Sequence, residues 1–268
     1  MSTATLERPM RASHAARTID PIPTRRLIGV EISKMFNTRS GFWLATSVGI
    51  TATLATIATV LWAPRDTFGY GNFAAAVGFP MSVILPMMAV LAITSEWSQR
   101  SGLTTFTLVP HRGRVISAKL AATLAVGVAS VAIAFAVGAV GNVVGSAIVG
   151  VGTNWDMSLG HIALIFLADG LGMVMGFTIG VLVRSSAGAI VGYFVYALVL
   201  PAAFGTLAHF QPWFAHRQPW FDFQDSSTRL YDGDLASSDW AHLVVSGSYW
   251  LLLPLVVGCW LALRSEVK

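Results

Sequence analysis

Six long apolar stretches take up more than half of this 268-residue chain. A helix rises about 1.5 Å per residue and the hydrocarbon core of a bilayer is about 30 Å thick, so about 20 apolar residues are enough to cross it. The sequence therefore predicts six transmembrane helices, at Gly41–Trp62, Phe73–Thr94, Ser117–Val151, His161–Val183, Gly188–Ala208 and His242–Leu263.

The composition favours the same fold class, an all-α membrane protein. The chain is 54% apolar and 11% charged, whereas about 25% of the residues of a soluble protein are charged. Its one cysteine, Cys259, lies inside the last stretch, and no His or Cys residues have the spacing of zinc ligands. We therefore expect neither a disulfide framework nor a metal site.

Lys and Arg are distributed unevenly between the two sides that six spans define. Fourteen of the 17 fall on the side of the two termini, and the other three are Arg65, Arg217 and Arg229. Because cytoplasmic segments are enriched in Lys and Arg, we expect a multi-pass protein of the cell (plasma or inner) membrane with both termini in the cytoplasm. This topology explains the net charge of +4 without a nucleic-acid partner.

Two segments precede the first span. Residues 1–23 mix Ser, Thr, Arg, Pro and Ala without periodicity, which predicts a disordered cytoplasmic tail. Residues 24–40 carry one apolar helical stripe, with Glu31 and Lys34 mostly off it; the stripe consists of Ile28, Ile32, Met35 and Phe36. We expect an amphipathic helix in the cytoplasmic interface of the lipid bilayer. The alternative is a simple extension of the first span.

The remaining residues, 41–268, form one predicted transmembrane domain with two notable loops, at 95–119 and 209–241. Pro80 and Pro86 are expected to kink the second span. The third span is too long for one perpendicular crossing, so it must tilt, extend into solvent, or break near residues 138–145.

The last outer loop, 209–241, is rich in aromatic residues. Aromatic side chains with Pro and Asp on the outer side indicate short interfacial or re-entrant helices at headgroup level. Trp213, Trp220 and Phe221 either belong to an aromatic belt or form an outer gate over a pathway.

The segment 95–119 is the densest polar part of the chain. It contains a short helix-like stretch (103–108), then Pro110, then a basic turn. Such a loop is suited to docking a cytoplasmic protein, although an ordinary basic loop is the alternative. The sequence has no Gly-x-x-x-x-Gly-Lys-Ser/Thr phosphate-binding motif, so any ATP must be bound by another polypeptide.

The run from Glu96 to Lys119 resembles the signature loop of permease subunits of type-2 ABC exporters. The residues that carry the resemblance are Glu96, Ser101, Gly102, Thr104, Thr105, Leu108 to Arg114, Ala118 and Lys119. Leu103 stands where many relatives have Thr. The helix with Glu31 and Lys34 is similar to the family's N-terminal helix, and the six-span layout with a large last outer loop is similar to the type V exporter fold.

The resemblance implies that this loop docks on a separate cytoplasmic ABC ATPase, which binds ATP and Mg²⁺, while this chain binds no cofactor and has no catalytic residue. The implied coupling residues are Glu96, Gly102, Thr104, Thr105, Pro110, Arg112, Arg114 and Lys119. It also implies a dimer with a second permease, either another copy or a different chain, that encloses an export path.

Asp169 lies well inside the fourth span, where a charge is costly and is a functional candidate by default. Gly172, Gly176 and Gly180 follow on its face, a stripe that lets another helix approach closely. Asp169 therefore either lines a cavity or hydrogen-bonds across a helix pair, with Asn142 as a plausible partner. Met173 either lines a path or packs.

Two other functions remain open at this point. One is a secondary carrier coupled to ions through Asp169. The other is a membrane-embedded enzyme or an assembly scaffold.

Overall fold

The computed structural model describes residues 22–65, 68–98 and 112–264, and within these ranges every regular element is a helix. Six of the helical runs are long and apolar enough to cross a membrane, which confirms the six predicted spans. They are α2 (Arg39–Trp62), α3 (Tyr70–Ser98), α5 (Arg112–Val149), α6 (Leu159–Val183), the run from α7 to α8 (residues 186–210) and the run from α12 to α13 (residues 237–264).

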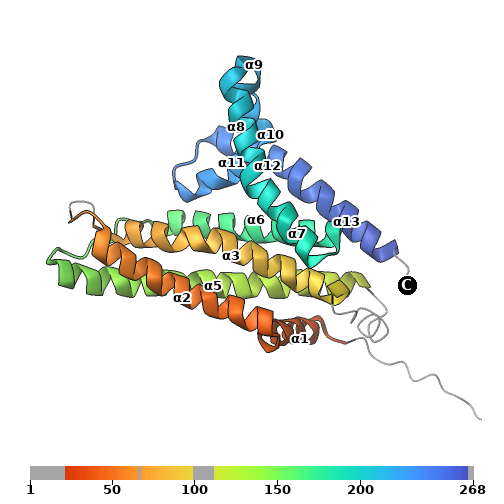
Figure 1. Cartoon of the computed structure of the whole chain (residues 1–268), viewed down its shortest axis with the longest axis horizontal. Helices are drawn as coiled ribbons and strands as arrows, with labels where there is room; N and C mark the ends of the chain where they lie inside the picture. The colour runs from red at the N-terminus through yellow and green to blue at the C-terminus, as the bar shows by residue number, and fades with distance from the viewer. Residues whose placement is uncertain (1–21, 66–67, 99–111, 265–268) are drawn as a thin grey trace, which may run out of the picture.

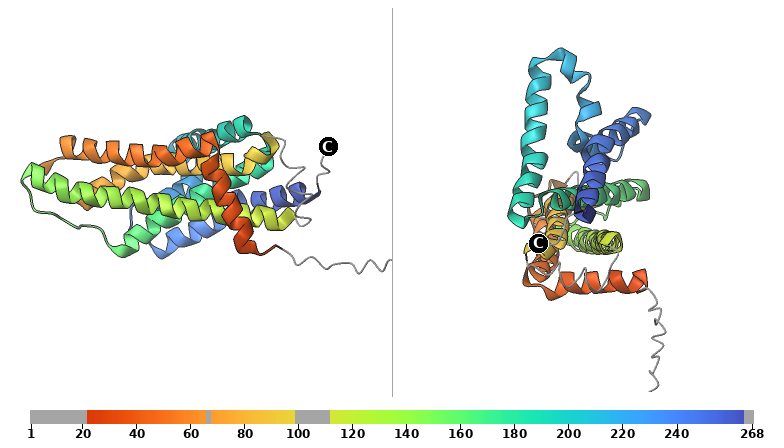
Figure 2. Two further views of the ribbon diagram at one scale, coloured as in Figure 1. Left: turned by 90° about the horizontal axis from the view of Figure 1, so that it is seen from below. Right: turned by 90° about the vertical axis from the view of Figure 1, so that its right-hand side faces the viewer.

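Helices α2, α3, α5 and α6 lie side by side as a four-helix bundle (Figures 1 and 2). Helix α3 is central, because its contacts with the other three helices are the most extensive in the bundle. Its fully buried side chains supply much of the core; they include Phe73, Val77, Met81, Leu85 and Ile93. The bundle therefore buries α3 on several sides, and α2, α5 and α6 each keep an outward face.

Helix α3 continues as one α-helix through Pro80 and Pro86. A proline has no N–H, so Pro86 leaves the carbonyl of Ser82 without its helical donor. The hydroxyl of Tyr193, on α7, donates to that carbonyl oxygen at 3.4 Å. A neighbouring helix thus satisfies the freed backbone group, as membrane helices with prolines require.

Helix α5 is a single helix of 38 residues, so the third span does not break near residues 138–145. The glycines in that region serve packing instead. A Cβ at Gly141 would overlap Thr56 of α2, and a Cβ at Gly145 would overlap Val60 of the same helix. At about 1.5 Å per residue, α5 is longer than a bilayer core is thick, so it must tilt or project.

Helix α1 (Thr24–Asn37) lies across one end of the bundle and packs on α5 and α2 (Figure 2). The helical conformation is interrupted at Thr38, whose backbone is extended. The side chain of Thr38 accepts a hydrogen bond from the Gly41 amide. Helix α2 therefore begins at Arg39, whereas the sequence predicted the first helix to reach residue 40.

The last two spans leave the bundle at an angle (Figure 1). The first consists of α7 (Ser186–Phe194), a π-helical segment (Val195–Val199) and α8 (Leu200–Phe210). The second consists of α12 (Ser237–Gly247), a π-helical segment (Ser248–Leu252) and α13 (Leu253–Arg264). We call these two spans the divergent pair.

Four short helical segments join the divergent pair between residues 211 and 236. They are α9 (Pro212–Ala215), α10 (Gln218–Phe221), α11 (Phe223–Thr228) and the 3₁₀ turn Arg229–Tyr231. Helix α10 and helix α11 both pack against α12, and the 3₁₀ turn packs against α6.

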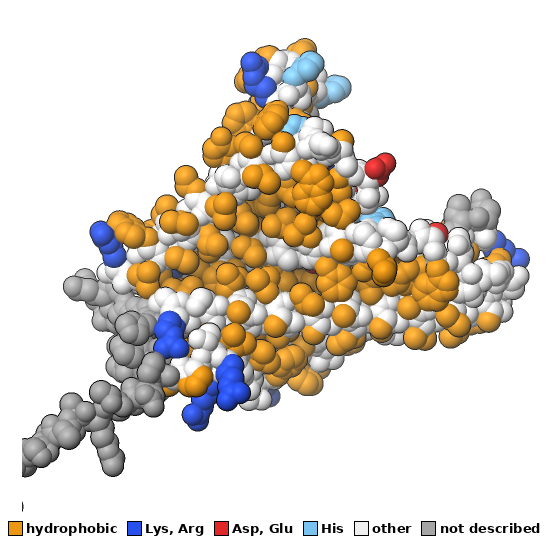
Figure 3. Space-filling model, turned by 180° about the vertical axis from the view of Figure 1, so that it is seen from behind, with side chains coloured by type: hydrophobic (Ala, Val, Ile, Leu, Met, Phe, Trp, Pro, Cys, Tyr) orange, Lys and Arg blue, Asp and Glu red, His pale blue; other side chains and the backbone are white. Residues whose placement is uncertain are grey.

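Charged and apolar side chains occupy different parts of the surface. Figure 3 shows apolar side chains over the middle of the molecule and Lys and Arg towards its ends. We call the end that carries α1, the start of α5 and the turn between α6 and α7 the basic end, and the opposite end the far end. The described cations of the basic end are Arg25, Arg26, Lys34, Arg39, Arg114, Lys119, Arg184 and Arg264.

Candidate functional site

The candidate coupling residues fall in segment 95–119, and the structure describes both flanks of that segment. Four of them lie in residues 99–111, outside the described residues: Gly102, Thr104, Thr105 and Pro110. Glu96 lies in the last turn of α3, and Arg112 is the first residue of α5. Both flanks are attached to other elements at the basic end.

On the α5 flank, Lys119 forms a buried ion pair with Glu31 of α1. Lys119 Nζ donates to Glu31 Oε2 at 2.5 Å, and Lys34 Nζ donates to Glu31 Oε1 at 2.7 Å. The side chains of Lys119 and Glu31 are only 5% and 7% exposed. Burial raises the pKa of Glu31, but the two lysines outweigh it and hold that pKa below its usual value. Glu31 is therefore ionised at neutral pH.

Arg114 makes a second attachment between α5 and the start of α1. Its Nη2 donates to the backbone oxygen of Ile22 at 2.6 Å and lies 3.5 Å from Thr24 Oγ1. Arg114 and Lys119, which the resemblance implied as coupling residues, thus both contact α1 in the structure. Any movement of the start of α5 would carry α1 with it.

On the α3 flank, three hydroxyl groups join the end of α3 to the start of α7. The Oγ of Ser186 lies 2.8 Å from Thr94 Oγ1 and 2.7 Å from Ser98 Oγ. Ser186 directly follows the turn between α6 and α7, where Arg184 takes a left-handed conformation with φ of 56°. This cluster was not predicted from the sequence, although small hydroxyl residues at the ends of two predicted spans were a signal for it.

Asp169 lies near the middle of α6 and is 3% exposed. Its Oδ1 accepts a hydrogen bond from the hydroxyl of Tyr231 at 2.8 Å, and no partner for Oδ2 is found among the described residues. Asn142 is not its partner, which corrects the pairing suggested by the sequence. The amide nitrogen of Asn142 donates instead to the backbone oxygen of Asn154 at 2.9 Å.

Tyr231 is attached to α6 at two points. His161 Nε2 lies 2.7 Å from the Tyr231 backbone oxygen, so this nitrogen is the donor. Two residues further on, Gly233 has φ of +81°, and a Cβ there would overlap the His161 ring. Burial and the nearby Asp169 carboxylate raise the pKa of Tyr231 above its usual value, so its hydroxyl stays a donor. Tyr231 therefore binds the segment between α8 and α12 to the bundle.

The glycine stripe of α6 packs against α3. A Cβ at Gly176 would lie 2.5 Å from the backbone oxygen of Pro86, and one at Gly180 would overlap Ile93 Cγ2. Gly172 lies beside the Pro86 ring. Met173 is 2% exposed and fills the space over Gly127 of α5. These residues pack helices together, which was one of the two roles the sequence left open.

The three candidate gate residues lie on the short helices that join the divergent pair. Trp213 lies on α9, and Trp220 and Phe221 lie on α10; all three are exposed. The Trp220 ring meets His242 edge to face at 4.5 Å, and Trp250 Nε1 donates to the Phe221 backbone oxygen at 2.8 Å. Helix α10 is thus held by the last span.

Across the described part of the chain, no group of three or more His, Cys, Asp or Glu side chains could hold a metal ion. No family model matches the sequence, and no curated protein matches it either.

Proposed function

We propose that this protein is the transmembrane permease subunit of an ATP-driven ABC exporter. Two permeases, either identical or different, would enclose the translocation path. Each would be coupled through segment 95–119 to a separate cytoplasmic ATPase, which binds the ATP and Mg²⁺. The motif from Glu96 to Lys119 and the six apolar helices support this proposal.

One observation carries the proposal: both flanks of segment 95–119 are attached to other helices. The ion pair of Lys119 with Glu31 attaches α5 to α1, and Ser186 attaches α7 to the end of α3. The ion pair is buried, so breaking it is costly. A partner that moves the segment would therefore also move α1 and the fifth span, which is a route from a docked ATPase to the transmembrane helices.

The proposed orientation places the basic end in the cytoplasm. Helix α1 would lie in the interface, with Arg25 and Arg26 near lipid phosphates. The short helices between α8 and α12 would then lie at the outer headgroup level. Trp213, Trp220 and Phe221 would guard the outer end of the path there.

The Oδ2 of Asp169, which has no partner among the residues that the structure describes, favours one alternative, a secondary carrier coupled to ions. Substitution of Asp169 by Asn distinguishes the two functions in vesicles. An ATP-driven exporter keeps ATP-dependent transport after Asp169→Asn, whereas a carrier loses its dependence on the ion gradient.

The first test is purification of the protein from native membranes in a mild detergent, followed by mass spectrometry of the proteins that co-elute. A near-stoichiometric soluble protein with a phosphate-binding loop supports the proposal. A stable preparation without an ATPase contradicts it.

A cross-linking experiment locates the contact with the ATPase. Because Cys259 is the single cysteine of the sequence, replacing it leaves an introduced cysteine as the only thiol. In a Cys259→Ser background, a photoreactive thiol reagent is attached to Thr105→Cys in the proposed docking segment. The matched control carries Thr228→Cys on α11. We expect the ATPase to be captured from residue 105 and not from residue 228, and equal capture from both would contradict the docking site.

A further inference from the structure

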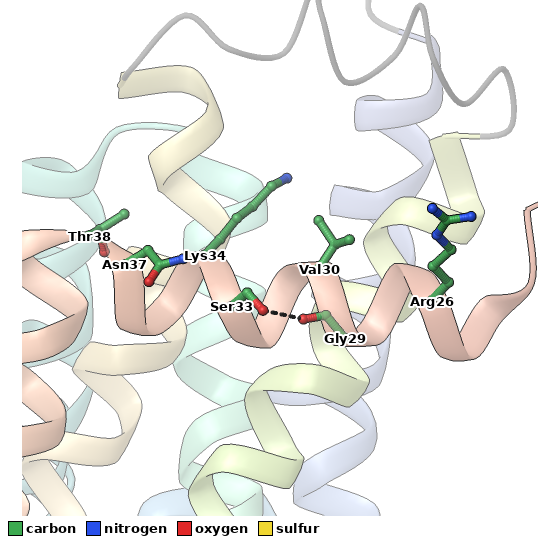
Figure 4. Close-up of a pocket in the computed structure, with 7 residues that line it drawn as sticks. All are labelled: Arg26, Gly29, Val30, Ser33, Lys34, Asn37 and Thr38. Carbon is green, nitrogen blue, oxygen red and sulfur yellow. Dashed lines mark hydrogen bonds between the residues drawn. The ribbon is translucent and has the colours of Figure 1, made fainter.

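Glu31 and Asp169 are both buried carboxyl groups, at 6% and 3% exposed, but their surroundings differ. Glu31 accepts hydrogen bonds from two lysines, Lys34 on its own helix and Lys119 on α5. Figure 4 shows Lys34 projecting from α1. A buried charge has to be paired in this way, because it has lost its water. Glu31 is therefore buried as a carboxylate.

Asp169 has no such compensation within the residues that the structure describes. The hydroxyl of Tyr231 donates to its Oδ1 at 2.8 Å, and Oδ2 has no hydrogen-bond partner. Oδ2 is also buried, so it has no surface on which a water or a metal ion could lie. An ionised carboxylate at this depth of a membrane span would thus be an uncompensated buried charge, which is a costly state.

The elements packed around Asp169 do not bring a charge to it. Helices α3, α5 and α13 all pack on α6, but each carries its charged residues near its ends. On the α7 side, the hydroxyl oxygen of Tyr193 lies 3.9 Å from the Cβ position of Gly172, one turn after Asp169. The other titratable side chains on the elements that pack there include Tyr231, His161 two turns earlier on α6, and Asp225 with Arg229, which pair with each other. None of them is a cation in contact with Asp169, so a proton is the one neutralising partner that fits.

We propose that Asp169 carries a proton on Oδ2, and that this proton allows the loop element of Tyr231 to close on the bundle. A neutral carboxyl group fits both contacts: Oδ1, as its carbonyl oxygen, accepts from Tyr231, and Oδ2, as its hydroxyl oxygen, needs no donor.

Loss of the proton would oppose this closure. A carboxylate would have to be hydrated, and Tyr231 belongs to the loop that covers Asp169, whereas its other neighbours are membrane-spanning helices. Water would therefore enter where Tyr231 now lies. The site does not depend on the proposed transport function. It also differs from the ion site of a carrier, because its proton stays bound while the loop is closed.

Infrared difference spectroscopy of the full-length protein in lipid vesicles at neutral pH tests the protonation. We expect a carboxylic-acid C=O band that Asp169→Asn removes. The matched control is Asp156→Asn, at an exposed carboxyl group whose Oδ1 accepts from the Gly71 amide. This control should keep the band. If Asp169→Asn removes only carboxylate bands, Asp169 is ionised and the proposal is overturned.

Tyr231→Phe tests which oxygen holds the proton while Asp169 itself stays in place. The variant removes the hydroxyl that donates to Oδ1, so the C=O band should move to higher frequency. A band that keeps its frequency would show that Oδ1 is not the carbonyl oxygen, and would overturn the placement of the proton on Oδ2.

Hydrogen exchange in residues 223–236 tests the closure, with the wild type and Asp169→Asn compared at each pH so that the intrinsic rates cancel. At neutral pH we expect equal protection, because Asn mimics the neutral acid. The closed form holds one proton more than the open form. Above the pH at which the acid band disappears, exchange in the wild type alone should therefore quicken, by about tenfold per pH unit. Lower protection of Asp169→Asn at neutral pH, or equal protection throughout, would overturn the role of the proton.

Discussion

Three helices of the four-helix bundle and the two spans of the divergent pair are similarly apolar, but they are buried to different extents. The buried share is 44–50% for α3, α5 and α6 and 17–28% for the pair, and α2, at the edge of the bundle, has 22%. The most apolar window of α3 has a mean hydropathy of 2.2 and is 50% buried, whereas that of the α7–α8 run has a mean hydropathy of 1.9 and is 17% buried. Lipid tails are as apolar as leucine, so a membrane helix gains little by hiding its apolar side chains from them. Hydropathy therefore indicates whether a helix can cross the bilayer. It does not indicate which other helices that helix packs against.

The prolines of the two regions show the same difference. In α3, Pro86 is held by α6, and Tyr193 satisfies the carbonyl that this proline frees. In the divergent pair, π-helical segments end two residues before Pro201 and Pro254. Such segments mark places where a helix accommodates a lost hydrogen bond by local unwinding. Neighbouring helices thus surround Pro86 in α3, whereas the less buried pair has a π-helical segment beside each of these prolines.

The largest expected effect comes from adding a side chain in the bundle. In Gly176→Leu the new Cβ meets the backbone of Pro86, which cannot move aside, and we expect folded protein to be lost. Gly205→Leu makes the same change in α8, where there is space. Size-exclusion chromatography and thermal unfolding in detergent should show a normal control. Equal loss of folded protein in the two variants would contradict the difference in packing between the four-helix bundle and the divergent pair.

The second prediction tests whether α1 belongs to the bundle. Lys119→Ala leaves the buried Glu31 without its partner on α5, and we expect a loss of about 3 kcal/mol in the free energy of unfolding. The double variant with Glu31→Gln should recover part of that loss, because it removes the uncompensated charge. Urea or thermal unfolding of the four proteins in a double-mutant cycle measures the coupling. Additive losses would show that the pair does not attach α1.

A pH titration tests the same contact without a mutation. The folded-state pKa of Glu31 lies below its usual value of 4.5, so the stabilisation is fully present above that pH and is lost as the pH falls through the lower folded-state value. A fluorophore on Ser33→Cys in a Cys259→Ser background reports release of α1. We expect release only below about pH 4.5; release near pH 6 would contradict an ionised, paired Glu31.

A smaller effect is expected at the contact between the bundle and the loop of the pair. Tyr231→Phe removes the hydroxyl that donates to Asp169. Neither oxygen of this buried carboxyl group then has a hydrogen-bond donor among the described residues, and we expect a loss of about 2 kcal/mol in the free energy of unfolding. Hydrogen exchange should quicken in residues 223–236. Tyr193→Phe removes the longer bond to Ser82 and should cost less, about 1 kcal/mol. A larger loss of stability in Tyr193→Phe than in Tyr231→Phe would show that the contact of α7 with α3 contributes more than the contact of the loop with α6.

The smallest effect is expected within the pair itself. Pro201→Ala restores a backbone donor beside the π-helical segment Val195–Val199, and we expect a change in stability of less than about 1 kcal/mol. Amide exchange in residues 195–205 should slow as the helix becomes regular. Unchanged exchange would mean that packing, and not the proline, sets the local unwinding.

The sequence predicted the existence of the six spans well, because length and hydropathy suffice for that purpose. It did not predict the contact of Asp169 with Tyr231, since 62 residues separate them and the tyrosine lies in a loop. The ion pair of Glu31 with Lys119 had a signal, namely opposite charges in two segments expected at the same membrane level. We predicted separate roles for the two residues, because Glu31 was assigned to the interfacial helix and Lys119 to the coupling loop.

Helix direction and continuity were harder to predict. The sequence allowed a break in the third span near residues 138–145, but the glycines there fit closely against α2, so the helix continues. Nothing in the apolar runs indicated that the last two spans would diverge, because tilt is set by packing against neighbours. The glycine stripe of α6 was informative, since close approach is a local requirement that residue size alone reveals.

The turn between α6 and α7 has a consequence for how the protein is made. Only Arg184 and Ser185 separate the two helices, and Arg184 has the left-handed conformation that reverses the chain. During synthesis these spans can therefore enter the bilayer together as a hairpin, and in the proposed orientation its basic tip stays on the side of the ribosome. A weakly packed fifth span would then be carried into the membrane by the well-packed fourth, before any partner is present to receive it.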